Sequence, residues 1–175
     1  MLGLSKACII AYDEYINIPY VKDYEKLLND NKIGYEFILW DRSGNDHISN
    51  LSVDRHVFTA NTKKTKLSKI IPFLQWRRFV KKIIKSNNYS FVIICTTIPA
   101  VLLFDLLTRQ FKKRFLLDIR DFTYENIYVY KWLVEKLIKA AGIVVISSKG
   151  FLRWLPGAKS NYILTHNITQ KEDQF

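Results

Sequence analysis

The chain has 175 residues, of which 49% are hydrophobic and 25% charged, values typical of one soluble domain with a sizeable core. Its 27 Lys and Arg residues against 16 Asp and Glu give a formal net charge of +11, which favours anionic partners such as phosphorylated glycans, lipid head groups or nucleic acid. We find neither an apolar run of the ~18 residues that span a membrane nor a signal peptide. We therefore expect a cytoplasmic protein whose membrane contact, if any, is peripheral on the inner face of the cell membrane.

Short apolar segments alternate with longer amphipathic ones, which predicts a parallel sheet with helices on both faces. From the N-terminus, we expect a strand at Ala7–Tyr12, a helix after Pro19, a strand at Tyr35–Trp40, an exposed loop at Asp41–Asp54 and a short strand at Arg55–Thr59. Then follow a helix at Leu67–Lys85, a strand at Phe91–Cys95, a helix at Pro99–Phe111, a strand at Phe115–Ile119, a helix at Glu125–Ala141, a strand at Ile143–Ile146, a short helix at Lys149–Leu155 and a strand at Tyr162–Leu164.

These elements predict one doubly wound, Rossmann-like α/β domain with a mostly parallel seven-stranded sheet. It covers residues 1–167, and residues 168–175 form a polar tail. Pro72 is predicted to interrupt its helix early, and Ile127 is predicted to face the core.

Two segments resemble a known family. Asp118–Glu125 (DIRDFTYE) is similar to the DxxDxxPE-type segment of family 4 glycosyltransferases, with Tyr124 where proline is common. Ala140–Asn167 resembles that family's pattern of a strand ending in serine, a short helix, a loop, a strand and a final Asn. The resemblance implies the N-terminal, acceptor-binding domain of a two-domain GT-B enzyme, with residues 168–175 as the start of an interdomain linker.

In that family, the C-terminal domain binds the nucleotide sugar through two glutamates seven residues apart, which would lie beyond Phe175. The resemblance therefore implies that the donor binds only together with a C-terminal domain or partner chain, and that this chain alone is inactive. The turn Tyr12–Pro19 also lacks the glycines that relatives often have there. Because a Cβ at every position obstructs close backbone approach, phosphate binding at this turn is disfavoured.

The candidate catalytic residues are Arg120 and Asp121, which follow a predicted central strand at the sheet edge where ligands bind. Many relatives have a histidine at the position of Arg120. Arginine stays charged and cannot act as a base, but it can donate to a phosphate or a sugar hydroxyl while Asp121 accepts from the acceptor hydroxyl. The alternative is a structural ion pair of Arg120 with Asp118 or Asp121.

The candidate acceptor-binding residues follow predicted strands in the same way. They are Asp13, Glu14, Thr96, Thr97, Asp118 and Glu125. Structural alternatives remain for several of them, because hydroxyls and acidic side chains also stabilise helix N-termini. The same applies to Ser147 and Ser148, one of which is predicted to cap the short helix that follows.

The helix from Pro72 to Lys85 separates an apolar side from a basic stripe. The stripe consists of Arg77, Arg78, Lys81, Lys82 and Lys85. An anionic bilayer attracts each such side chain by ~1 kcal/mol, so the stripe predicts a site for an anionic membrane surface or a lipid-linked diphosphate acceptor. The alternative is an ordinary solvated helix face.

The remaining reactive residues predict no metal and no cofactor. Cys8 and Cys95 lie in apolar runs, which indicates buried thiols. His47 and His56 lack partners at ligand spacing. The first strand lacks the GxGxxG of nucleotide-binding oxidoreductases, and no zinc-finger, RNP or recognition-helix pattern accompanies the positive charge, so a nucleic-acid partner is not expected.

The expected function is therefore the acceptor side of a hexosyltransferase-type enzyme. It would transfer a sugar from a nucleotide-sugar donor to a lipid-linked glycan acceptor in polysaccharide biosynthesis. The alternative is a non-enzymatic membrane-surface or scaffold subunit that docks a catalytic partner.

Overall fold

The computed structural model describes residues 6–42, 54–60, 70–121, 123–124, 126–153, 155 and 162–165. Their strands form one sheet in which all neighbouring strands run parallel, in the order β3-β2-β1-β4-β5-β6-β7. The strands are β1 (Lys6–Ile10), β2 (Gly34–Asp41), β3 (Arg55–Thr59), β4 (Phe91–Cys95), β5 (Phe115–Ile119), β6 (Ile143–Ile146) and β7 (Tyr162–Leu164). The predicted seven-stranded Rossmann-like α/β fold is confirmed.

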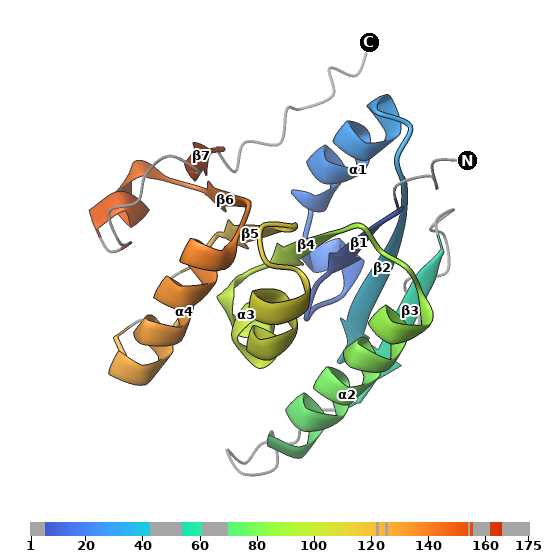
Figure 1. Cartoon of the computed structure of the whole chain (residues 1–175), viewed down its shortest axis with the longest axis horizontal. Coiled ribbons are helices and arrows are strands. Elements are labelled where there is room, and N and C mark those ends of the chain that lie inside the picture. Colours follow the sequence, from blue (N-terminus) through green and yellow to red (C-terminus); the bar gives the residue numbers. More distant parts are fainter. Residues whose placement is uncertain are drawn as a thin grey trace.

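Helices cover both faces of this sheet (Figure 1). The α-helices are α1 (Val21–Asp30), α2 (Ile70–Ser86), α3 (Thr97–Leu102) and α4 (Tyr128–Ala140). Shorter helical turns are η1 (Tyr15–Asn17), η3 (Leu106–Gln110) and η4 (Lys149–Arg153). The helices α2, α3 and α4 pack in one core cluster with one face of the strands, and α1 packs in a second cluster with the other. Because both faces of the sheet are covered, the side chains on both sides of the central strands are buried. This explains why these strands are continuous apolar runs in the sequence.

The largest buried side chains lie on the face that α2 covers. Trp40 of β2 and Trp76 of α2 are both fully buried, and their rings stack with centroids 6.1 Å apart. The Trp40 indole donates from Nε1 to the carbonyl oxygen of Ala60 at 3.0 Å. Trp40 thus joins the end of β2 to the residue that follows β3 and, through Trp76, to α2.

Three helix predictions are corrected. Pro72 does not interrupt α2, because it lies in the first turn, where a helix does not need its N–H. The apolar segment predicted as one helix at Pro99–Phe111 is divided into α3 and the π-helical turn η3. Ile127 does not face the core: it precedes α4 in an extended conformation (φ −86°, ψ 119°), and 53% of it is exposed.

The predicted loop at Asp41–Asp54 and the polar tail lie largely outside the described residues. Asp41 itself is the last residue of β2 and is buried. The strand order reverses direction between β1 and β4, since β2 and β3 lie on one side of β1 and the later strands on the other. In doubly wound sheets, ligands bind beyond the carboxyl ends of the strands at this switch point.

Candidate functional site

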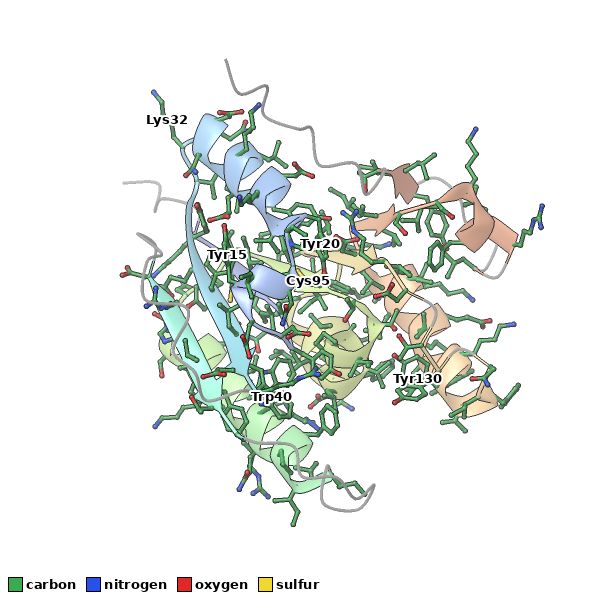
Figure 2. The ribbon with its side chains drawn as sticks, turned by 180° about the vertical axis from the view of Figure 1, so that it is seen from behind. Tyr15, Tyr20, Lys32, Trp40, Cys95 and Tyr130 are labelled. Carbon is green, nitrogen blue, oxygen red and sulfur yellow. The ribbon has the colours of Figure 1, made fainter. Side chains whose placement is uncertain are left out.

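A polar crevice of about 540 Å³ lies at the switch point. The segments after β1, β4 and β5 supply its polar lining, which comprises Asp13, Asn17, Thr96, Asp121 and Thr123, together with the aromatic side chains of Tyr12, Tyr20 and Tyr124. Tyr20 and Cys95, which both line the crevice, lie side by side near the middle of the sheet in Figure 2. Three of the residues predicted from strand ends, Asp13, Thr96 and Asp121, are thus brought together.

Thr96 has an unusual backbone conformation. With φ 74° and ψ 166°, it lies in a region that is essentially restricted to glycine, at a cost of about 1–3 kcal/mol. Its N–H donates to the Asp118 carbonyl oxygen at 2.9 Å, which holds it in place. Although Thr96 is the N-cap residue of α3, its side chain makes no capping hydrogen bond, and its buried Oγ1 has no partner among the described residues. Strain and an unsatisfied hydroxyl at one residue indicate a functional position.

The carboxylate of Asp13 is held in a fixed orientation. Its Oδ1 accepts the backbone N–H of Glu14 at 2.8 Å and the Nδ2 group of Asn17 at 2.9 Å. Both bonds reach the same oxygen, so this carboxylate of the crevice lining has a defined orientation. Glu14, in contrast, is buried and does not belong to the described lining of the crevice.

Asp118 lies in the core behind the crevice. It is 0% exposed, and it accepts hydrogen bonds from Arg120 Nε at 2.7 Å and from the Tyr24 hydroxyl at 2.6 Å. Burial raises the pKa of Asp118, although the charge of Arg120 and the Tyr24 hydrogen bond act against that shift. Burial also raises the pKa of Tyr24, so its hydroxyl stays a donor. Asp118 therefore holds the side chains of Arg120 and Tyr24 in position.

Arg120 contacts Tyr20, which lines the crevice. Its guanidinium lies 4.4 Å from the Tyr20 ring centroid, and only 7% of the residue is exposed. Burial would lower the pKa of Arg120, but the charge of Asp118 outweighs it and raises this pKa. The structural ion pair with Asp118 is thus present, whereas Asp121 is exposed at the crevice wall.

Of the other predicted residues, Thr97 is not in the described lining of the crevice. Thr97 is buried, and its Oγ1 accepts the Tyr130 hydroxyl at 2.8 Å, which joins α3 to α4. Glu125 lies outside the described residues. Of the two serines predicted as caps, Ser148 accepts the N–H of Gly150 at 3.1 Å at the start of η4, while Ser147 donates to the Arg120 carbonyl oxygen at 3.2 Å.

An apolar trough of about 350 Å³ adjoins the crevice and shares three lining residues with it, Tyr12, Ile98 and Tyr124. The rest of its lining comprises Arg42, Ile70, Phe73, Leu74, Val101, Leu102 and Tyr130. The crevice and the trough together form one groove that is polar at one end and apolar at the other. Sequence reasoning missed Tyr12 and Arg42. Arg42 directly follows β2, and Tyr12 lies two residues after the end of β1, so both lie just beyond strand ends, as Asp13 and Thr96 do.

Two residues of the basic stripe on α2, Arg77 and Lys81, form ion pairs with Asp105, the residue before η3. Asp105 accepts Arg77 Nη2 at 2.9 Å on one oxygen and Lys81 Nζ on the other. Burial alone would raise the pKa of Asp105, but the Lys81 hydrogen bond and both positive charges bring it below its ordinary value. A shallow depression beside this pair is lined by the other stripe residues Arg78, Lys82 and Lys85, and also by Arg109. Arg109 was missed because η3 brings it to α2 only in the folded chain.

No protein-family model matches the sequence, and no curated protein is significantly similar to it. Within the described part of the chain, no helix is long and apolar enough to cross a membrane. Over those same ranges, no group of three or more His, Cys, Asp or Glu side chains is arranged to hold a metal ion.

Proposed function

We propose that the chain is the acceptor-binding half of a GT-B glycosyltransferase of polysaccharide biosynthesis, and that its crevice binds the glycan acceptor. The observation that carries the proposal is that the strained Thr96 lines the same crevice as Asp13 and Asp121 at the switch point. Carboxylates and hydroxyls are suited to sugar hydroxyls, and the tyrosine rings of the lining offer flat surfaces to a sugar ring. Both kinds of group converge in this crevice.

In the proposed reaction, Asp121 is the catalytic residue of this half. The acceptor hydroxyl oxygen attacks the anomeric carbon of the donor sugar, and its proton passes to the Asp121 carboxylate. The nucleotide leaves with the electron pair of the broken bond. Asp13 and Thr96 orient the acceptor, and Arg120 acts as a positioning residue, because it contacts the crevice through the Tyr20 ring.

The donor is proposed to bind only together with a C-terminal domain or a partner chain. The turn after β1 supports this, because it contains no glycine and forms the side-chain-bearing helical turn η1. Backbone amides there are less accessible to a phosphate than in a glycine-rich turn.

The test is an NMR titration of the ¹⁵N-labelled chain with a panel of mono- and oligosaccharides, and separately with nucleotide sugars. We expect a saccharide to shift the amide signals of Asp13, Thr96 and Asp121, while nucleotide sugars shift none of them. Asp121→Asn should abolish transfer once a donor-binding domain is supplied, whereas Asp30→Asn at the end of α1 should not. Shifts caused by nucleotides alone, with no response to saccharides, would overturn the proposal in favour of a nucleotide-binding domain.

A second candidate function, a membrane-surface scaffold subunit, is favoured by exposed apolar side chains on α4 together with the basic stripe on α2. Tyr128, Val129 and Trp132 at the start of α4 are exposed, Tyr128 by 82%. The test is co-sedimentation with phosphatidylglycerol or phosphatidylcholine vesicles in the absence of sugar nucleotides. Binding to the anionic vesicles alone, lost in Lys82→Glu/Lys85→Glu and kept in Lys22→Glu/Lys26→Glu on α1, would support a membrane surface site. A protein that sediments with neither kind of vesicle would exclude a membrane surface site.

A further inference from the structure

Arg42 lies at the junction between the polar and apolar parts of the groove. It follows β2, and its Nη2 donates to the Tyr12 carbonyl oxygen at 2.8 Å. Its guanidinium also lies 3.8 Å from the Tyr12 ring centroid, so a carbonyl and an aromatic ring fix the plane of the cation. A cation held in this way loses little conformational freedom when an anion binds.

The hydrogen-bonding capacity of Arg42 is not used up by the protein. Nε is buried and has no acceptor among the described residues, and Arg42 forms no ion pair with them. A buried donor without an acceptor is costly, and arginine matches the oxygens of a phosphate better than a lysine would. Asp13 and Asp121, the acidic residues in the described lining of the groove, line the crevice and not the trough.

The wall beyond Arg42 is apolar. Phe73 of α2 stacks on Tyr12 with centroids 5.8 Å apart, and Val101 and Leu102 of α3 line the trough with it. Ile70 and Leu74 also line the trough and are about half exposed, so the apolar surface continues to the rim. A volume of about 350 Å³ lies within the roughly 300–1,000 Å³ of small-molecule pockets.

We infer that this groove binds a single-chain lipid phosphate, with the phosphate on Arg42 and the hydrocarbon chain in the trough between α2 and α3. Charge complementarity identifies the head group, and the apolar lining identifies the chain. The inference deepens the proposed function and rests on it only for the reaction: a sugar carried on such a lipid would enter the adjoining polar crevice. The binding itself requires no sugar nucleotide and no second domain.

The experiment uses the full chain and decyl phosphate below its micelle-forming concentration, with binding followed by calorimetry. Inorganic phosphate and decyl glucoside are the reference ligands, one without the chain and the other without the charge. We expect decyl phosphate to bind at least about tenfold more tightly than either, since charge-assisted hydrogen bonds and chain burial both contribute.

Two variants separate the two halves of the site. Arg42→Gln is expected to weaken decyl phosphate binding by about tenfold or more, and Arg153→Gln on η4 is its matched control. Leu74→Asp should weaken binding while Arg42 stays in place. Leu27→Asp should not, since Leu27 is a similarly exposed leucine on α1, away from the trough. Thermal unfolding of each variant distinguishes lost binding from lost folding.

The outcomes are distinct from those of the saccharide test. Equal affinity for decyl glucoside, or decyl phosphate binding unchanged in Arg42→Gln, would overturn the phosphate site. Inorganic phosphate binding as tightly as decyl phosphate would overturn the lipid assignment. Lipid phosphate binding with no saccharide response would uphold this inference while the transferase proposal fails.

Discussion

Arg120 donates from Nε to Oδ1 of Asp118 at 2.7 Å, between two residues that are almost completely buried. Because strand side chains alternate, Asp118 shares the face of Leu116, under α1, where the Tyr24 hydroxyl reaches its second oxygen. The carboxylate therefore joins β5 to α1 and, through Arg120 and Tyr20, to the wall of the crevice.

The first prediction concerns this ion pair. Arg120→Met should lower the free energy of unfolding by about 3–5 kcal/mol, because it leaves the Asp118 charge buried without its partner. The double variant Asp118→Leu/Arg120→Met should lose clearly less than the single one. Urea unfolding followed by circular dichroism measures both. A double variant as unstable as Arg120→Met would show that the lost stability comes from packing and not from the unpaired charge.

The sequence predicted the strands of this fold better than its helices. The strands were predictable because buried parallel strands are continuous apolar runs, and the bounds of β3 to β7 agree with the structure. The break between α3 and η3 was not, because Pro99–Phe104 is a continuous apolar run and no glycine lies between Pro99 and Phe111 to mark it.

For the site, the rule that strand ends supply ligand-binding residues found Asp13, Thr96 and Asp121. It could not separate these from Asp118, which differs only in that its side chain lies under α1. Nor could it find Arg42, whose importance depends on its contact with Tyr12, 30 residues away in the chain.

The second prediction concerns Thr96. Thr96→Gly should raise the free energy of unfolding by about 1 kcal/mol, since relief of a strain of about 1–3 kcal/mol exceeds the extra chain entropy of glycine. It should also weaken saccharide binding in the crevice, and Thr96→Ser, which keeps the hydroxyl, should restore binding.

Lys32→Gly is the matched control for Thr96→Gly. Lys32 also has a positive φ, 54°, but lies after α1 and away from the crevice lining. It should gain stability with no change in saccharide binding. If Thr96→Gly destabilises the protein, the strain assigned to Thr96 is wrong.

The third prediction concerns Glu36 and pH. This buried carboxylate of β2 accepts hydrogen bonds from Lys6 of β1, from Tyr89 two residues before β4 and, at 3.3 Å, from His56 of β3. Burial would raise the pKa of Glu36, but the three hydrogen bonds outweigh it and lower this pKa.

A depressed pKa in the folded state means that the stability contributed by Glu36 is full above its unfolded pKa of about 4.3 and is lost as the pH falls through its lower folded pKa. The wild-type free energy of unfolding should therefore decline below about pH 4.3, and Glu36→Gln should show a weaker dependence in this range. Chemical denaturation from pH 3 to pH 7 measures it, with Asp30→Asn as the exposed control. An unchanged pH dependence in Glu36→Gln would contradict the assignment.

The last prediction concerns the close approach of β6 to the turn before β5. A Cβ at Gly142 would lie 2.7 Å from the backbone oxygen of Lys113, and backbone can move less easily than a side chain. Lys113 is itself fixed there, because its φ is 62° and its Nζ donates to the carbonyl oxygen of Lys139 at 2.9 Å. Gly142→Ala should therefore lower the free energy of unfolding by about 1–3 kcal/mol.

Gly34→Ala at the start of β2 is the control, because nothing lies within 4 Å of the added Cβ and alanine reduces the entropy of the unfolded chain. It should be neutral or slightly stabilising in the same urea titration. Since β6 ends at Ile146 and is followed by Ser147, which donates to the Arg120 carbonyl oxygen, a displaced β6 should also disturb the crevice wall. Equal stabilities of the two alanine variants would contradict the close contact at Gly142.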